Sequence, residues 1–338
     1  MDAIILAGGL GTRLYPLTLS TPKSLLPFLD RAIIEYQIDI ACEAGCERIV
    51  AASGHMSEMI SEYALCTDLG IECVQEDSPL GTGGAIANVI RDKGLRGPLL
   101  ALNGDILCDI APRSLVATAE ALGTPATITA APVEDATAYG TLEIDKTGML
   151  KAFREKDAAA KHEKRSMINA GIYYLDQRAV KRLACTEGAF SMETDFFPAL
   201  AEEGAVGVHI HNGFWRDIGT LELYFKTHFD ILGYFLMMGA ANFGGKRGDF
   251  ALFKDFIYLH NQTVLGAECD LYHRVVLMKG AEVGEKSHLR NCILLPGARI
   301  GKGCKLETVI VDTGYTVPDG ANISNKVLSP AHEEPFGG

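Results

Sequence analysis

The 338-residue sequence has a deficit of basic residues, no paired-cysteine motif and no long apolar run, and each shortage excludes a class of protein. Its 31 Lys and Arg residues against 43 Asp and Glu residues give a net charge of −12. No nucleic-acid partner is expected, because general nucleic-acid binding requires a basic face. The longest largely apolar stretch, residues 231–241, is too short to cross a bilayer, so no membrane partner is expected.

The nine cysteines include no Cys-x-x-Cys pair, and an odd number at irregular spacing fits neither a disulfide framework nor a zinc site. Free, buried thiols in a reducing cytosol are expected instead. Cys42 and Cys46, at helical i, i+4 spacing, are predicted to be core thiols. The amino-terminal residues lack the basic flank and cleavage site of a secretory signal. These features predict a cytoplasmic protein.

Short apolar runs alternate with helical periodicity over the first hundred residues, as expected for a parallel sheet with right-handed crossovers. Ligands of such sheets bind beyond the carboxyl ends of the strands, where Gly8, Glu76 and Asp105 are placed. The next hundred residues are rich in β-type runs, which predict a mixed sheet added to the first. Strands are expected at residues 3–6, 49–52, 71–74, 99–102, 126–133, 140–144, 168–174 and 206–211.

The last part of the chain changes to short apolar units punctuated by glycine. Leu277, Val283 and Leu289 are six residues apart, and the spacing recurs in residues 300–306 and 311–323 with a slip of about one residue between groups. A period of six predicts a β-helix of hexapeptide repeats, and an irregular β-sandwich is the alternative. Because the ends of a β-helix are apolar and need covering, a homo-oligomer is expected.

A glycine-rich turn follows the first predicted strand. Gly8, Gly9 and Gly11 allow backbone N–H groups to approach phosphate oxygens, and Arg13 and Lys23 add positive charge. The turn lacks the Walker A pattern and the third glycine of a dinucleotide fingerprint. A structural turn with surface cations is the alternative.

The pattern GG-x-GTRL-x-PLT at residues 8–18, followed by Pro22-Lys23, resembles the sugar-nucleotide pyrophosphorylases, nucleotidyltransferases that join an NTP to a sugar 1-phosphate. Family-like motifs continue in the same order at residues 102–105, 138–140, 153–156, 168–171 and 214–219, so the resemblance covers roughly residues 1–230. A narrower resemblance at residues 79–84, 191–198 and 215–219 is to the mannose-1-phosphate guanylyltransferases.

The resemblance implies an α/β fold in which a Rossmann-like, GT-A-like mixed-sheet nucleotidyltransferase domain precedes a left-handed parallel β-helix of hexapeptide repeats. The expected domains are a catalytic domain at 1–235, a connecting segment at 236–262 and the β-helix at 263–338. The expected reaction transfers a nucleotidyl group from an NTP to a sugar 1-phosphate and releases pyrophosphate. GTP is the expected NTP and mannose 1-phosphate the expected sugar phosphate.

The attacking phosphate oxygen is already an anion, so the reaction needs charge neutralisation and alignment rather than a general base. The resemblance implies that Asp105 and Asp217 hold Mg²⁺, a hard cation that prefers oxygen ligands. It also implies that Arg13 stabilises the leaving pyrophosphate and that Lys23 acts near the α-phosphate. All four residues are present, which argues against a non-catalytic regulatory homologue.

On the sugar side, the resemblance implies that Lys156 holds the phosphate and that Glu155 and Asn169 bind hydroxyls. A solvated charged face is the alternative for Glu155 and Lys156. Asp157 replaces the proline that usually follows in the family, and Ser24 replaces the one that often follows Lys23. The expected sugar-phosphate set is Tyr139, Gly140, Glu155, Lys156, Asn169 and Asp217.

Glu76 matches the family's base-contacting position. A carboxylate can accept both the N1–H and the amino group of guanine, whereas uracil and thymine offer one imide N–H, so Glu76 favours GTP. Related uridylyltransferases can also carry Glu here, so UTP- or dTTP-dependent hexose transfer and heptose 1-phosphate guanylylation remain alternatives. Gly83 and Gly84 are expected to allow close backbone contact with the base. The expected nucleotide set is Leu6, Ala7, Gly8, Gly9, Gly11, Thr12, Arg13, Lys23, Glu76, Pro79, Gly81, Thr82, Gly83, Gly84, Asn103, Gly104 and Asp105.

His209 and His211 alternate along a predicted strand and are expected to form an exposed pair, which is weak support for a metal site.

Overall fold

The computed structural model describes residues 1–154, 166–238, 250–330 and 333–335. The chain forms two compact units, one from residues 1–9 and 34–215 and the other from residues 10–33 and 216–338. The predicted boundaries near residues 235 and 262 therefore do not coincide with these units and stay a prediction.

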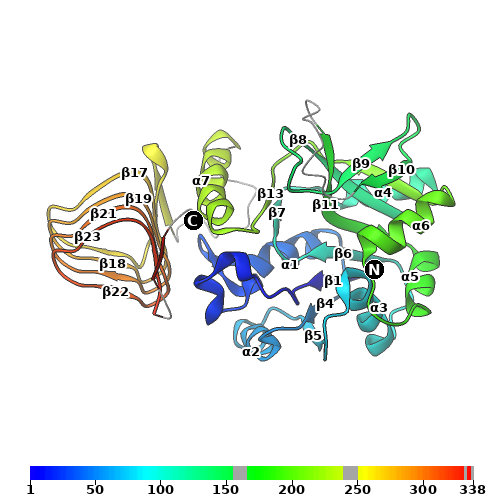
Figure 1. The fold of residues 1–338 in the computed structure, drawn as a ribbon, viewed down its shortest axis with the longest axis horizontal. Helices are drawn as coiled ribbons and strands as arrows, with labels where there is room; N and C mark the ends of the chain where they lie inside the picture. Colours follow the sequence, from blue (N-terminus) through cyan, green and yellow to red (C-terminus); the bar gives the residue numbers. More distant parts are fainter. Residues whose placement is uncertain (155–165, 239–249, 331–332, 336–338) are drawn as a thin grey trace. The chain divides into compact units, whose positions relative to one another are not determined.

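The first unit is built on a nine-stranded mixed sheet whose central part is parallel (Figure 1). β1 (Asp2–Leu6) pairs in parallel with β4 (Arg48–Ser53) on one side and with β6 (Leu99–Asn103) on the other, and β4 pairs with β5 (Glu72–Gln75). β1, β4 and β6 are short, mainly apolar runs that are mostly buried, which is typical of parallel strands. The predicted parallel sheet is confirmed.

Antiparallel strands extend this sheet, as the sequence predicted. β11 (Ser166–Leu175) pairs with β6 and with β8 (Ala126–Val133), and β12 (Val206–Ile210) pairs in parallel with β8. The remaining elements of this region are β7 (Ile106–Cys108), β9 (Thr141–Ile144), β10 (Leu150–Arg154), α1 (Ile33–Glu43), α2 (Ser57–Thr67), α3 (Gly81–Lys93), α4 (Pro112–Leu122), α5 (Gln177–Ala184), a π-helical turn (Met192–Phe196) and α6 (Phe197–Glu202).

The second unit contains the segment after the glycine turn and α7 (Leu221–Met238). The hairpin formed by β2 (Pro27–Phe28) and β3 (Arg31–Ala32) packs on α7, where Tyr224 donates a hydrogen bond to the Pro27 carbonyl. The His228 ring lies 4.0 Å from the Phe28 ring, centroid to centroid. Three short 3-10 turns, Thr12–Leu14, Leu17–Leu19 and Lys23–Leu25, precede this hairpin, and β13 (Trp215–Asp217) precedes α7.

The C-terminal part of the second unit is a stack of parallel β coils, which confirms the β-helix (Figure 1). Leu289 pairs with Leu306 and Leu306 with Ile323, so one coil takes 17 residues. Within a coil, successive inward side chains are separated by six, six and five residues. The five-residue step, as from Leu289 to Leu294, explains the slip in the sequence period. The inward side chains are buried, with Leu277, Leu289 and Leu294 fully inaccessible to solvent.

One sheet of the β-helix is bounded at both ends by antiparallel strands, β14 on β15 and β24 on β23, whereas the other consists of four parallel strands. The strands of the whole β-helix are β14 (Phe250–Phe253), β15 (Ile257–His260), β16 (Val264–Leu265), β17 (Asp270–Leu277), β18 (Glu282–Val283), β19 (His288–Leu294), β20 (Arg299–Ile300), β21 (Lys305–Val311), β22 (Thr316–Val317), β23 (Asn322–Leu328) and β24 (Glu333–Pro335).

The cysteine prediction is correct on bonding and wrong on burial. All nine thiols are free, but Cys42, near the end of α1, is exposed, and Cys46, which follows the turn after α1, is only half-buried. Cys108, Cys292 and Cys304 are the buried thiols.

Candidate active site

The carboxyl ends of the parallel strands bring several predicted nucleotide-binding residues together. Leu6 at the end of β1 pairs with Ala52 and with Asn103, so the loops after β1, β4 and β6 start side by side. The Gly104 N–H donates to the Leu6 carbonyl at 2.9 Å, and a Cβ at Gly104 would lie 2.5 Å from the same oxygen. Only glycine fits there, and it places Asp105 directly beyond the end of β1.

Glu76 lies against the glycine turn. A Cβ at Gly8 would be 3.2 Å from Glu76 Oε1, while Glu76 Oε2 accepts a hydrogen bond from the Leu80 N–H at 3.2 Å. Burial raises the pKa of this carboxyl, and the Leu80 hydrogen bond partly opposes the shift. One carboxylate oxygen is thus anchored by the backbone and the other faces the loop of Gly8.

The glycines of residues 81–84 form the first turn of α3 instead of a loop before it. The Gly83 and Gly84 N–H groups both donate to the Phe190 carbonyl, at 3.0 and 3.1 Å, and a Cβ at Gly83 would clash with the Phe190 ring. A Cβ at Gly84 would meet the Gly188 carbonyl and Leu80, so close packing accounts for both glycines, and their contact with a base stays a prediction. Pro79, Gly81 and Thr82 belong to the same turn region.

Residues predicted for the sugar side also gather in the first unit. The Asn169 N–H donates to the Gly140 carbonyl at 3.1 Å, and the Tyr139 ring packs edge-on to Trp215 at 5.3 Å. The Trp215 indole N–H donates to the Ala170 carbonyl at 3.0 Å. Glu155 and Lys156 lie outside the described residues.

The second unit holds the predicted catalytic cations and one predicted metal ligand. A Cβ at Gly219 would lie 2.8 Å from Asp217 Oδ2 and 3.3 Å from Arg13 Nη2, so both charged groups sit beside this glycine. Gly11, with φ of 63°, packs against Thr18 and Lys23, and Thr18 Oγ1 donates to the Gly11 carbonyl at 2.8 Å. Thr12 begins the turn that carries Arg13.

The predicted metal ligands are of the chemical type that binds magnesium. Asp105 and Asp217 offer carboxylate oxygens, the ligands that Mg²⁺ prefers. Asp105 belongs to the first unit and Asp217 to the second.

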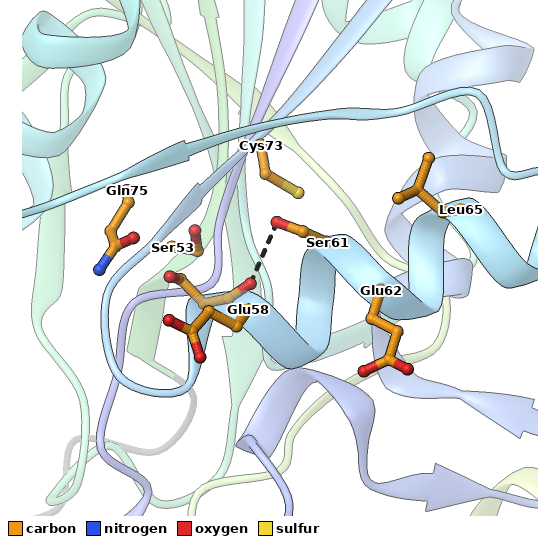
Figure 2. A pocket seen from close by; sticks show the side chains of 8 residues that line it. Ser53, Glu58, Ser61, Glu62, Leu65, Cys73 and Gln75 are labelled. Atoms are coloured by element: carbon orange, nitrogen blue, oxygen red, sulfur yellow. Dashed lines mark hydrogen bonds between the residues drawn. The ribbon is translucent and has the colours of Figure 1, made fainter.

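A separate pocket of about 490 Å³ opens between α2 and the strands β4 and β5 (Figure 2). Ser53 and Gln75 line it from the strands, and Glu58 and Glu62 line it from the helix. No basic side chain is among its lining residues, so the pocket is unsuited to phosphate groups.

Cys108, Asp109 and His211 form a cluster that the sequence did not predict, and their ligand atoms lie within 4.8 Å of one another. His211 is buried beyond the end of β12, and His209 contacts Ser114 and Thr118 of α4, so the prediction of an exposed pair is wrong. The residues are far apart in the sequence, and only the folding of β7 and β12 brings them together.

The cluster is best described as a buried ion pair. His211 Nε2 lies 3.0 Å from Asp109 Oδ1 and 3.2 Å from the Phe214 carbonyl, which can only accept a hydrogen bond. Burial lowers the pKa of His211, but the hydrogen bonds to Asp109, Cys108 and Phe214 outweigh it and raise the pKa to about 10. A protonated imidazole therefore joins the end of β12 to the end of β7.

With the fold and the site described, comparison with known proteins defines the class. Residues 2–233 match the nucleotidyl transferase family, and residues 259–329 match the GlmU-like C-terminal hexapeptide family. The chain belongs to the nucleotidyl transferase family.

Similar curated proteins carry a more specific name. The chain is 37% identical to the mannose-1-phosphate guanylyltransferase catalytic subunit beta of Drosophila pseudoobscura pseudoobscura, over 64% of this chain and 58% of that protein. It is 31% identical to the probable mannose-1-phosphate guanylyltransferase 1 of rice (Oryza sativa subsp. japonica), over 86% of this chain and 80% of that protein. The matched region thus spans less than two thirds of the Drosophila relative.

Solved structures agree on the fold. HddC from Yersinia pseudotuberculosis, complexed with GMP-PN, aligns with a TM-score of 0.58 and 26% identity, over 68% of this chain and 99% of that chain. Among the described residues, no helix is long and apolar enough to cross a membrane.

The His211 ion pair predicts a pH-dependent stability. Because its folded pKa of about 10 lies above the ordinary value of 6.5, the stabilisation is full below pH 6.5 and is lost as the pH rises to about 10. Urea unfolding of the wild type and of His211→Gln should show a free-energy difference that is largest near pH 6 and shrinks toward pH 10. His209→Gln is the control, since burial lowers the pKa of His209. A His211→Gln difference that stays constant over this range would contradict the ion pair.

Proposed function

We propose that the protein transfers a guanylyl group from GTP to mannose 1-phosphate, giving GDP-mannose and pyrophosphate. The observation that carries the choice of base is the Glu76 carboxylate, held by Leu80 at one oxygen and facing the Gly8 loop with the other. A fixed carboxylate can accept the N1–H and the amino group of guanine together. The guanylyltransferase names of the similar proteins support the same choice.

In this proposal, the backbone of residues 6–11 and the loop at Asn103 and Gly104 receive the nucleotide, and Tyr139, Gly140 and Asn169 receive the sugar. Arg13 neutralises charge on the leaving pyrophosphate and Lys23 acts at the α-phosphate. The phosphate of the sugar 1-phosphate attacks the α-phosphorus as an anion, so no side chain has to remove a proton.

Asp105 and Asp217 would hold Mg²⁺, which supplies positive charge against the reacting phosphates when bound. The chain's own part is to present two carboxylates and to keep Gly219 free of a side chain, because a Cβ there would collide with Asp217.

A cytoplasmic location and a homo-oligomer belong to the same proposal. Nine free thiols support a reducing compartment, and the repeat-built β-helix supports contact between subunits. Light scattering at micromolar concentration that shows only a monomer would contradict the second point.

Substrate choice is tested by product formation with GTP, ATP, UTP and dTTP against mannose, glucose and heptose 1-phosphates. GTP with mannose 1-phosphate should give the highest kcat/KM, and Glu76→Gln should reduce the preference for GTP over UTP by about tenfold, because an amide cannot accept both guanine donors. UTP or dTTP outrunning GTP by about tenfold would overturn the choice of base. A higher rate with a heptose phosphate would overturn only the choice of sugar.

The paired-carboxylate role is tested by Asp105→Asn and Asp217→Asn, with Asp92→Asn on the exposed face of α3 as the control. Each of the first two should lower kcat by about a hundredfold or more and change the dependence of rate on Mg²⁺ concentration. Thermal unfolding should show that the three variants remain folded. Wild-type turnover in both Asp105→Asn and Asp217→Asn would refute the role.

A further inference from the structure

The sequence motif at residues 191–198 has no part in the scheme above, yet its Glu193 is the centre of a hydrogen-bonded chain within the first unit. Glu193 Oε2 accepts from Thr82 Oγ1 at 2.5 Å and from Ser191 Oγ at 2.7 Å. Its other oxygen accepts from Tyr173 Oη at 3.0 Å. Tyr173 Oη in turn accepts from Asn169 Nδ2 at 2.8 Å. The chain therefore connects the first turn of α3 with Asn169 on the sugar side.

The direction of every hydrogen bond in this chain is fixed. The Gly171 N–H can only donate, and its partner at 3.0 Å is Asn169 Oδ1, so Nδ2 must face Tyr173. Nδ2 can only donate, so the Tyr173 hydroxyl accepts there and must send its own hydrogen to Glu193. An ionised carboxylate only accepts, which suits it to receive three hydroxyl groups.

Burial preserves these hydrogen-bond directions. Tyr173 has no solvent exposure, and its ring packs edge-on to Phe197 at 4.9 Å. Burial and the neighbouring Glu193 raise the pKa of Tyr173 well above its usual value, so the hydroxyl keeps its hydrogen. The Thr82 hydroxyl is fixed as well, because it accepts the Met192 N–H at 2.9 Å while it donates to Glu193.

Asn169 has bonding capacity left for a ligand. Its Oδ1 has one further lone pair and its Nδ2 one further hydrogen after the contacts with Gly171 and Tyr173 are made. A sugar hydroxyl could use that donor and acceptor, but only while the amide keeps its orientation. Without the Tyr173 hydroxyl, Nδ2 loses the acceptor that holds it.

We propose that Glu193 and Tyr173 are positioning residues: through Tyr173, Glu193 orients the Asn169 amide toward the sugar, and through Thr82 it holds the nucleotide-side turn of α3. Glu193 is thereby the shared anchor of the two substrate sides. This inference rests on the proposed function, in which Asn169 binds the sugar, and on the predicted contact of residues 79–84 with the nucleotide.

The two arms of the chain are tested separately by steady-state kinetics. Tyr173→Phe keeps the ring and should raise KM for the sugar 1-phosphate by about tenfold with KM for the nucleotide unchanged. Thr82→Val should raise KM for the nucleotide, and Glu193→Gln should raise both values. Tyr174→Phe, on the next residue of β11, is the matched control and should change neither.

Action through Asn169 is tested by a double variant. Asn169→Ala should raise KM for the sugar 1-phosphate, and adding Tyr173→Phe should raise it no further. Thermal unfolding of each variant identifies loss of folding, and Tyr173→Phe carries the test if Glu193→Gln unfolds. Unchanged KM in Tyr173→Phe, or a double variant whose effects multiply, would overturn the inference while the proposed function stands. A wild type that is inactive with every substrate pair would overturn both.

Discussion

Parallel pairing of β1 with β4 and β6 is the constraint on which the rest of the first unit depends. It places Leu6, Ala52 and Asn103 side by side, so that the glycine turn and the Asn-Gly-Asp loop start at one edge of the sheet. β5 pairs with β4 on the same side, and Glu76, the residue after β5, lies against Gly8. The backbones approach so closely that a side chain at Gly104 would collide with the Leu6 carbonyl. Gly104 is therefore required by the close approach of the strand ends themselves.

The sequence predicted the regular parts of this architecture well. Buried parallel strands are continuous apolar runs, and the hexapeptide period is repeated often enough to be recognised in spite of its slips. A coil of 17 residues is one residue shorter than three hexapeptides, and this difference explains the change of phase in the sequence pattern.

What the sequence could not predict depends on partners distant in the chain. The packing of Gly83 against the Phe190 ring and of Gly84 against the Gly188 carbonyl could not be predicted, because Gly188 and Phe190 are distant in the sequence. His211 looked exposed because Asp109, its ion-pair partner, follows β7 and is distant in the sequence. Cys42 and Cys46 have helical spacing, but α1 ends at Glu43, before Cys46, and spacing alone does not tell where a helix ends. Glu193 was part of a recognised motif, and its role required knowledge of where Tyr173 and Thr82 lie.

In the second unit, a basic and an acidic side chain meet at one glycine, because Arg13 and Asp217 both lie beside Gly219. The proposed function places guanine at Glu76 and the sugar at Asn169. A crystal structure with GDP-mannose bound tests it most directly. We expect hydrogen bonds from the guanine edge to the Glu76 carboxylate and between mannose hydroxyls and the Asn169 amide. A base bound away from Glu76, with that carboxylate contacting only Leu80, would contradict it.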